Sequence, residues 1–210
     1  MLFRLVYSSV LLSFLVLMTA CAIGKVQPHY ASHHDEIAAW QQELDAEFAN
    51  PSTPPLKAED LEGFEGLEYF PIDSTYRVVA RVVRIADKDS LEMATTSTRI
   101  SVYDVYAELH FELQGKPQVL EVYQSHQLRE TRAYANYLFL PFRDPTNGRT
   151  TYGGGRYMDL EIPEGDTMVL DFNKAYNPYC AYASGFSCPL VPPTNRLSVQ
   201  VLAGVKAYEK

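Results

Sequence analysis

Alternating hydrophobic and polar side chains indicate that much of this chain forms β-strands. Residues 106–113 are the clearest example, because every second residue is apolar and those between, such as His110, are polar. This period of two is typical of a strand with one buried face. A turn at Gly115-Lys116 leads into a partner strand. Similar β-branched or alternating segments predict strands at 75–84, 119–124, 136–142, 157–162, 168–172 and 197–205.

The segment before these strands has the period of an amphipathic helix. Ser32 and Asp35 have the spacing of a capping box, which begins a helix. Apolar residues then recur at steps of three and four: Ile37, Trp40, Leu44 and Phe48. Pro51 ends the pattern, so we place the helix at 32–49 and its apolar stripe against the body of the protein.

Together these elements predict a mainly β protein. With about seven or eight strands joined by short turns, the expected architecture is an antiparallel sandwich or open barrel with one N-terminal helix. The chain has 210 residues, which suffices for one domain with a proper core. We therefore expect a single β-rich domain over residues 32–210.

The first 20 residues have the pattern of a targeting sequence. Basic Arg4, a following apolar run and small residues at the end are the three regions of a secretory signal peptide over residues 1–20. The closing letters LMTAC resemble the lipobox of bacterial lipoproteins, which implies that Cys21 becomes the first mature residue and is acylated. Ala22 implies sorting to the outer membrane. We expect a lipid-anchored cell-envelope protein with a tether at 21–31; the alternative is a secreted protein with an incidental Cys21.

The composition is that of a folded, acidic chain. Hydrophobic residues make up 47% and charged residues 21%, and the formal net charge is −8. Phosphate binding needs a basic face, so nucleic acid is not an expected partner. The membrane, through the lipid, and a small polar ligand or an envelope protein are the expected partners.

Cys180 and Cys188 predict a disulfide, because thiols oxidise in the compartment to which the leader points. A shared metal or a nucleophilic cysteine is the weaker alternative, since no histidine is near them in sequence. The histidines at 29, 33 and 34 are expected on a solvated helix end rather than at a metal. We expect no metal and no other cofactor.

The stretch from residue 152 to residue 206 concentrates unusual side chains. Its glycines at 153–155 lack the features of a phosphate-binding loop and are expected to permit a bulge or a close backbone approach. The candidate ligand-binding residues are Tyr152, Arg156, Asp171, Asn173, Tyr176 and Asn177. The alternative for the polar members is that they anchor loops through hydrogen bonds.

Three motifs carry a resemblance to a known family. They are YFPIDSTYRVVA, NYLFLPFRDPTNGRTTYGGGRYMDL and LDFNKAYNPYCAYASGFSCPLVPPTNRLSVQVLAG. The chain resembles, over roughly residues 31–206, the uncharacterised bacterial family catalogued as domain of unknown function 1684. The resemblance implies a single β-rich domain in which the 152–196 region matters, and it transfers no catalytic roles.

Three hypotheses for function follow. The leading one is a lipid-anchored envelope protein that binds a small polar or glycan-like ligand, or a protein partner, at the candidate surface, because tyrosine faces and bidentate donors suit such ligands. The second is an envelope hydrolase with Asp171 as general base and Arg156 as electrostatic stabiliser. The third is a purely structural lipoprotein. The chain has no GxSxG and no HExxH, which disfavours the enzyme.

Overall fold

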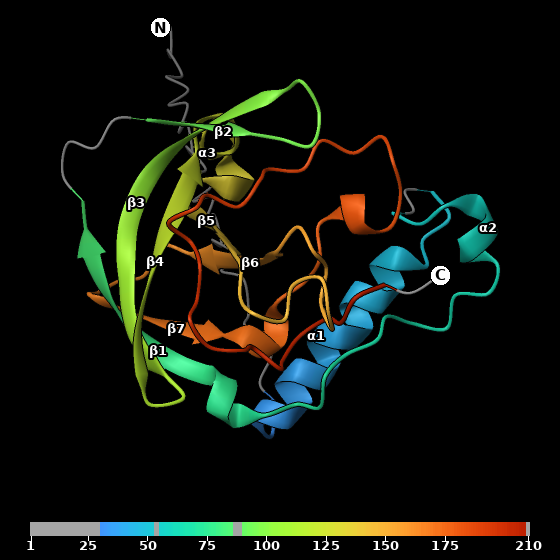
Figure 1. Ribbon diagram of the computed structural model, residues 1–210, viewed down its shortest axis with the longest axis horizontal. Helices are drawn as coiled ribbons and strands as arrows, with labels where there is room; N and C mark the ends of the chain where they lie inside the picture. Colours follow the sequence, from blue (N-terminus) through green and yellow to red (C-terminus); the bar gives the residue numbers. More distant parts are fainter. Residues whose placement is uncertain (1–29, 53–54, 86–89, 209–210) are drawn as a thin grey trace, which may run out of the picture.

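The domain is built on one strongly curled antiparallel sheet (Figure 1). The computed structural model describes residues 30–52, 55–85 and 90–208. Over these residues the sheet has seven strands: β1 (Arg77–Arg84), β2 (Leu91–Ala94), β3 (Ile100–Leu113), β4 (Lys116–Ser125), β5 (Tyr137–Phe142), β6 (Arg156–Glu161) and β7 (Thr167–Asp171). Their order is β6-β5-β4-β3-β1-β7, with β2 beside β3. The predicted mainly β fold is confirmed, in the form of a half-barrel.

The long hairpin of β3 and β4 forms the centre of this sheet. Its turn places Gln114 and Gly115 at φ values of 53° and 72°, the left-handed pair that suits the twist of a tight hairpin. β3 alternates as predicted over 106–113 but already begins at Ile100. The four-residue strand β2 was not predicted, because so short a segment carries almost no periodic signal.

Helix α1 (His33–Phe48) closes the open side of the curled sheet (Figure 1). The Ser32 side chain accepts a hydrogen bond from the Asp35 backbone at 3.1 Å, which confirms the predicted cap. Ile37 and Phe48 are buried, and Phe48 packs on Tyr182 with ring centroids 4.6 Å apart. The other helices among the described residues are short: α2 (Ala58–Leu61), α3 (His126–Arg129), and the 3-10 turns η1 (Ser74–Tyr76), η2 (Arg132–Tyr134), η3 (Phe172–Lys174) and η4 (Tyr179–Ala181).

The first turn of α1 is tied to the end of β7. His33 Nε2 lies 2.6 Å from Asp171 Oδ2, and Lys174 Nζ donates to Glu36 Oε1 at 2.6 Å. The expectation of a solvated helix end holds for His34, which is exposed, but His33 is half-buried and bound to Asp171. An imidazole at the first turn can reach across to a carboxylate on the neighbouring strand, and sequence spacing does not reveal that neighbour.

The predicted strand at 197–205 does not form within the described range 90–208. The alternation is real, since Leu197, Val199, Val201 and Ala203 are buried in the core. In the middle of the segment, however, side chains bind the backbone. Ser198 N donates to Gln118 Oε1 at 3.0 Å, and Val201 N donates to Asp144 Oδ2 at 2.8 Å. Residues 197–205 are therefore an extended segment that side-chain hydrogen bonds hold against the core, and they are not a strand of the sheet. We call this segment the plug.

The sequence predictions for the N-terminus fall mostly outside the described residues. These are the signal peptide at 1–20, the acylated Cys21 and the tether up to residue 29. His29 lies outside them as well. Among the described residues, no helix has the length and apolarity to cross a membrane.

Candidate functional site

Arg156 lies in the interior of the protein and not on a surface that a ligand could reach. Its side chain is 0% exposed, and it donates to Ala203 O at 2.5 Å, Val201 O at 2.9 Å and Asp144 Oδ1 at 3.4 Å. Burial lowers its pKa to about 10, while Asp144 opposes that shift, so the guanidinium is charged at neutral pH. Its contacts hold the 197–205 plug.

Asp171 and Asn173 also serve as anchors. Asp171 Oδ1 accepts from Asn173 Nδ2 at 2.8 Å, and its other oxygen faces His33. The Asn173 amide bonds both backbone groups of Asp73, at 2.9 and 3.0 Å. Asp171 and Arg156 share no hydrogen bond and line no common cavity among the described residues. The predicted pair is therefore not brought together.

Of the other three candidate residues, two are packed against the protein and one lines an open cavity. Asn177 is buried and donates to Lys206 O at 2.8 Å. Tyr152 lies so close to Gly154 that an added Cβ there would meet its ring at 2.3 Å, which fits the expected close approach at the glycines. Tyr176 is the one candidate of the six that lines the main cavity.

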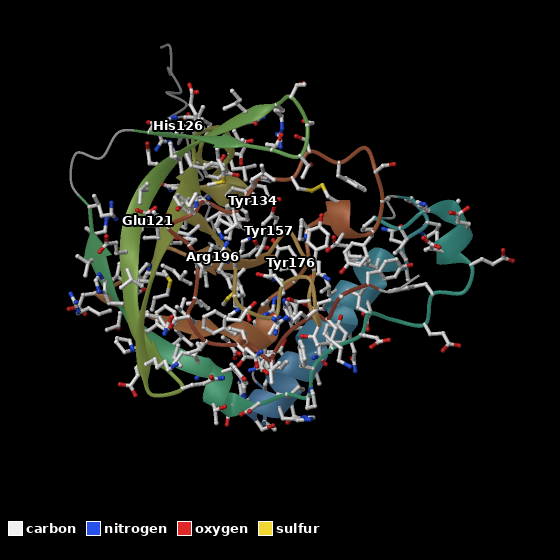
Figure 2. The ribbon with its side chains drawn as sticks, viewed as in Figure 1. Glu121, His126, Tyr134, Tyr157, Tyr176 and Arg196 are labelled. Atoms are coloured by element: carbon white, nitrogen blue, oxygen red, sulfur yellow. A yellow bond between two sulfur atoms is a disulfide. The ribbon has the colours of Figure 1, made fainter. Side chains whose placement is uncertain are left out.

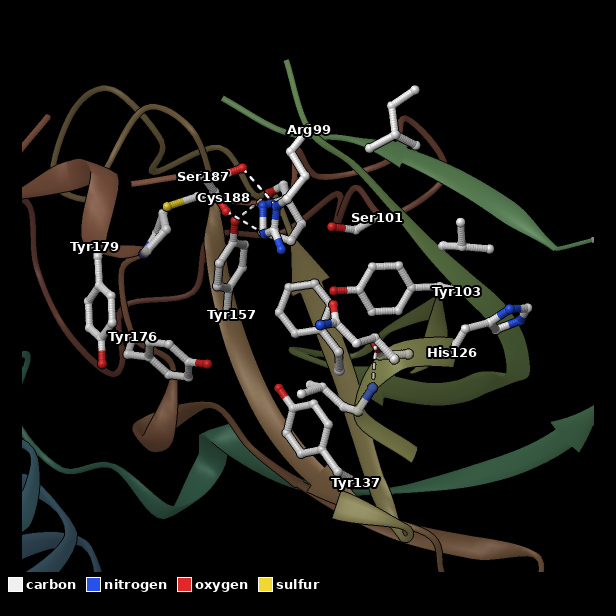
Figure 3. A pocket seen from close by; sticks show the side chains of 18 residues that line it. Arg99, Ser101, Tyr103, His126, Tyr137, Tyr157, Tyr176, Tyr179, Ser187 and Cys188 are labelled. Atoms are coloured by element: carbon white, nitrogen blue, oxygen red, sulfur yellow. Dashed lines mark hydrogen bonds between the residues drawn. The ribbon is translucent and has the colours of Figure 1, made fainter. Parts of the chain in front are cut away.

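A cavity of about 710 Å³ opens beside β3, β5 and β6 (Figure 3). We call it the tyrosine pocket. Its walls are Arg99, Ile100, Ser101, Val102, Tyr103, Ser125, His126, Gln127, Leu128, Tyr137, Phe139, Tyr157, Tyr176, Pro178, Tyr179, Ser187, Cys188 and Pro189. Phe139 and Tyr157 line the pocket, whereas their neighbours Leu138 and Met158 point into the main core on the other face of β5 and β6. Aromatic rings form much of the pocket wall, and pockets of this size accommodate small organic molecules.

The tyrosine rings are held in fixed orientations. Tyr137 and Tyr176 both donate to Asp159 Oδ1 at 2.7 Å, and the Tyr157 hydroxyl donates to Pro189 O. Tyr157 and Tyr176 meet edge to face, with centroids 6.0 Å apart. Both rings are drawn in Figure 3. Burial raises the pKa of Tyr157 and Tyr176, so both hydroxyls stay protonated. The pocket therefore offers pre-oriented, neutral aromatic surfaces.

The rim of the pocket joins the β2–β3 turn to the disulfide loop. Cys180 and Cys188 form the predicted disulfide (Figure 2). The Thr96 hydroxyl accepts from Cys188 N at 3.0 Å, and Leu190 N donates to Ala94 O at 2.8 Å. These hydrogen bonds attach the disulfide loop, which forms one wall of the pocket, to the β2–β3 turn.

A small polar network supports the opposite wall at α3. Asp104 accepts from His126 Nε2 at 2.7 Å, from Arg129 Nη1 at 2.5 Å and from the Ser90 hydroxyl at 3.0 Å. The hydrogen bond from His126 is the main cause that lowers the Asp104 pKa to about 2, and those from Arg129 and Ser90 add to it. The network ties α3, whose His126 lines the pocket, to β3.

This network predicts a pH dependence of stability. Because the Asp104 pKa is lower in the folded than in the unfolded chain, its contribution is full above the ordinary value of 3.8 and is lost as pH falls through about 2. Between pH 5 and pH 2, the melting temperature of the wild type should fall further than that of Asp104→Asn, measured by circular dichroism. Equal falls in the two proteins would contradict the assignment.

The described residues contain no group of three or more His, Cys, Asp or Glu side chains placed to hold a metal ion. The expectation that the protein uses no metal and no cofactor stays a prediction.

Most of the tyrosine pocket could not be predicted from the sequence. Tyr137 and Tyr157 lie on predicted strands that carried no sign of a site, Tyr103 lies in the part of β3 that was not predicted, and Arg99 directly precedes β3. One signal was present: Tyr137 and Phe139 share a strand face, as do Tyr103 and Val105, so aromatic residues recur on one face of these strands. Such a pattern is equally typical of a packed core. Only the curl of the sheet decides whether these rings fill a core or line an open pocket.

Comparison with known proteins identifies a family without an established activity. Residues 62–206 match the family described as "Protein of unknown function (DUF1684)". The solution NMR structure of an uncharacterised protein of Haloarcula marismortui is similar at 38% identity, with a TM-score of 0.64, over 81% of this chain and 92% of that one. No curated protein matches. The matched region and the shared fold place this chain in the DUF1684 family of proteins of unknown function.

Proposed function

We propose that this protein binds a small ligand in the tyrosine pocket while a lipid on Cys21 holds it at the bacterial outer membrane. The pocket carries the first part of the proposal. Its volume of about 710 Å³ and its pre-oriented aromatic walls are properties of small-molecule sites. Ring faces suit flat or sugar-like ligands, and Ser101, Ser125 and Gln127 supply polar contacts. A concave site of this kind favours a small molecule over a protein partner.

The geometry does not favour the alternative functions. A hydrolase that uses Asp171 with Arg156 would need both groups at one substrate, but Arg156 is enclosed by the plug and Asp171 is bound by His33 and Asn173. A purely structural lipoprotein would have no use for an open, aromatic cavity. Binding is therefore the function that we put forward.

Filling the pocket should weaken binding. Ser101 lines the cavity on β3 (Figure 3), so Ser101→Trp would occupy the space that a ligand needs. We expect the wild type to bind the neutral fluorescent probe N-phenyl-1-naphthylamine and Ser101→Trp to bind it at least about tenfold more weakly, a loss of about 1.4 kcal/mol. Fluorescence titration measures both. Val169→Trp is the control, because Val169 is exposed on β7 outside the pocket.

Two results would count against the proposal. The first is a wild type that does not bind the probe. The second is a Ser101→Trp variant that binds as well as Val169→Trp. Melting temperatures of both variants would show that each is folded.

The anchor is proposed from the sequence motif at Cys21. Each buried methylene of an acyl chain contributes about 0.8 kcal/mol, so several chains hold a protein at a bilayer. Cys21→Ala should abolish metabolic labelling with palmitate and move the protein from the membrane to the soluble fraction. If this variant partitions to the membrane as the wild type does, the proposed anchor is wrong. The substitution should not change ligand binding in the tyrosine pocket.

A further inference from the structure

Arg99 presents a fixed guanidinium at the mouth of the tyrosine pocket (Figure 3). Its Nε donates to the Ser187 hydroxyl at 3.0 Å, and its Nη2 donates to Ser187 O at 2.9 Å. The Ser187 hydroxyl is itself 2.9 Å from that of Thr95. The disulfide loop therefore orients the guanidinium before any ligand arrives.

Ser187 takes two of the five N–H donors of this guanidinium, one from Nε and one from Nη2, so three remain for a ligand. The edge formed by Nη1 and the second Nη2 hydrogen is left, and that edge can bind a carboxylate, sulfonate or phosphate through two parallel hydrogen bonds. None of the described residues places a carboxylate within ion-pair distance of Arg99.

The charge of the pocket is opposite to that of the protein. The chain carries a formal net charge of −8, yet the eighteen lining residues include no aspartate or glutamate. His126 is paired with Asp104, so Arg99 carries the positive charge of the lining. Asp159 lines a separate, smaller cavity beyond Tyr176. An anionic group is therefore attracted to the Arg99 end.

The pocket holds a second donor and an apolar floor. Tyr103 is 7% exposed, its hydroxyl points into the cavity, and no described residue gives that hydroxyl a hydrogen-bond partner (Figure 3). Arg99 lies close enough to oppose the rise that burial causes in the Tyr103 pKa. Phe139 stacks against Tyr103 with centroids 5.7 Å apart and forms part of the apolar wall.

We infer that the ligand of the tyrosine pocket is an amphipathic anion: one carboxylate, sulfonate or phosphate on Arg99, with an apolar ring or chain lying along the tyrosine rings. This inference rests on the proposed binding function and names its ligand class. The anion takes the free edge of the Arg99 guanidinium, and the Tyr103 hydroxyl can donate to a polar atom further in.

Two probes with the same aromatic body test the inference. N-phenyl-1-naphthylamine is neutral, whereas 1-anilinonaphthalene-8-sulfonate adds one sulfonate. We expect the wild type to bind the sulfonate at least about tenfold more tightly, since a hydrogen bond to a charged group is worth about 1.5 to 3 kcal/mol and 1.4 kcal/mol is a factor of ten. Arg99→Gln should remove this preference and leave the neutral probe within about twofold of wild type.

Two control variants distinguish the effect of the Arg99 charge in the pocket from the effect of a positive charge elsewhere on the surface. Arg196→Gln removes an exposed arginine that does not line the pocket (Figure 2), and it should leave both titrations unchanged. Arg99→Lys keeps the charge but not the planar edge, so it should retain part of the preference. It also provides a folded comparison if Arg99→Gln is less stable.

The outcomes test the anionic ligand class separately from the proposed function, which is ligand binding in the tyrosine pocket. If Arg99→Gln weakens both probes equally, or neither, the anion assignment is wrong and the pocket remains a binding site. If the wild type binds neither probe, or if Ser101→Trp binds both as wild type does, then the proposed function itself fails.

Discussion

Arg156→Ala should be among the most destabilising single substitutions in this protein. The guanidinium is fully buried, pairs with Asp144 and holds two carbonyls of the plug, at Val201 and Ala203. Its removal leaves the buried Asp144 carboxylate without its counter-ion, although Thr146 and Val201 still donate to it, and it takes the Arg156 donors away from two buried carbonyls. Breaking a buried ion pair in this way costs about 3 to 5 kcal/mol. At roughly 2 to 4 °C per kcal/mol, the melting temperature should fall by roughly 10 °C.

An exposed arginine provides the matched control. Arg77 Nε lies 3.6 Å from Asp171, but the Arg77 side chain is 45% exposed, so Arg77→Ala should cost about 1 kcal/mol or less. Urea denaturation of the two variants measures the difference. Similar free energies of unfolding would mean that Arg156 does not hold the plug.

Gly204→Ala should have the second large effect. Gly204 has a φ of +77°, which L side chains rarely adopt, and an added Cβ would lie 2.4 Å from Ala175 O. The left-handed backbone costs about 1 to 2 kcal/mol, and a forced shift in a packed region adds about 1 to 3 kcal/mol. The free energy of unfolding should therefore fall by about 2 to 5 kcal/mol, as measured in urea.

Gly115 separates these two contributions. Its φ of +72° is nearly the same, but an added Cβ there would meet no atom within 4 Å. Gly115→Ala should thus show the backbone cost alone, about 1 to 2 kcal/mol. If both variants lose the same free energy, the close contact with Ala175 contributes nothing.

Most of the fold could be predicted from the sequence because its signals are local. Ser32 caps α1 as its spacing indicates, and the alternation at 106–113 is that of β3. The segment 197–205 shows where such reasoning ends. Alternation reports which side chains are buried, but it does not report whether another strand or the side chains of Gln118 and Asp144 bind the backbone.

The candidate site was less predictable, because unusual residues and binding residues are different sets. Arg156, Asp171 and Asn173 are unusual since buried polar groups must hold loops in place, as the alternative reading of the sequence allowed. The residues that line the tyrosine pocket come from β3, the end of β4, α3, β5, β6 and the segments before β3 and after η3. Their meeting depends on the pairing and curl of the sheet, which no single segment encodes.

The side-chain-bound plug has a consequence for the order of folding. A ribosome delivers residues 197–205 after all of the described strands, yet this segment supplies Leu197, Val199, Val201 and Ala203 to the main core. Until it arrives, the inner face of the sheet is uncovered and the Asp144–Arg156 pair lacks its backbone partners. The emerging domain should therefore stay open and prone to aggregation until its last segment docks, so that completion of the core is a late, single event.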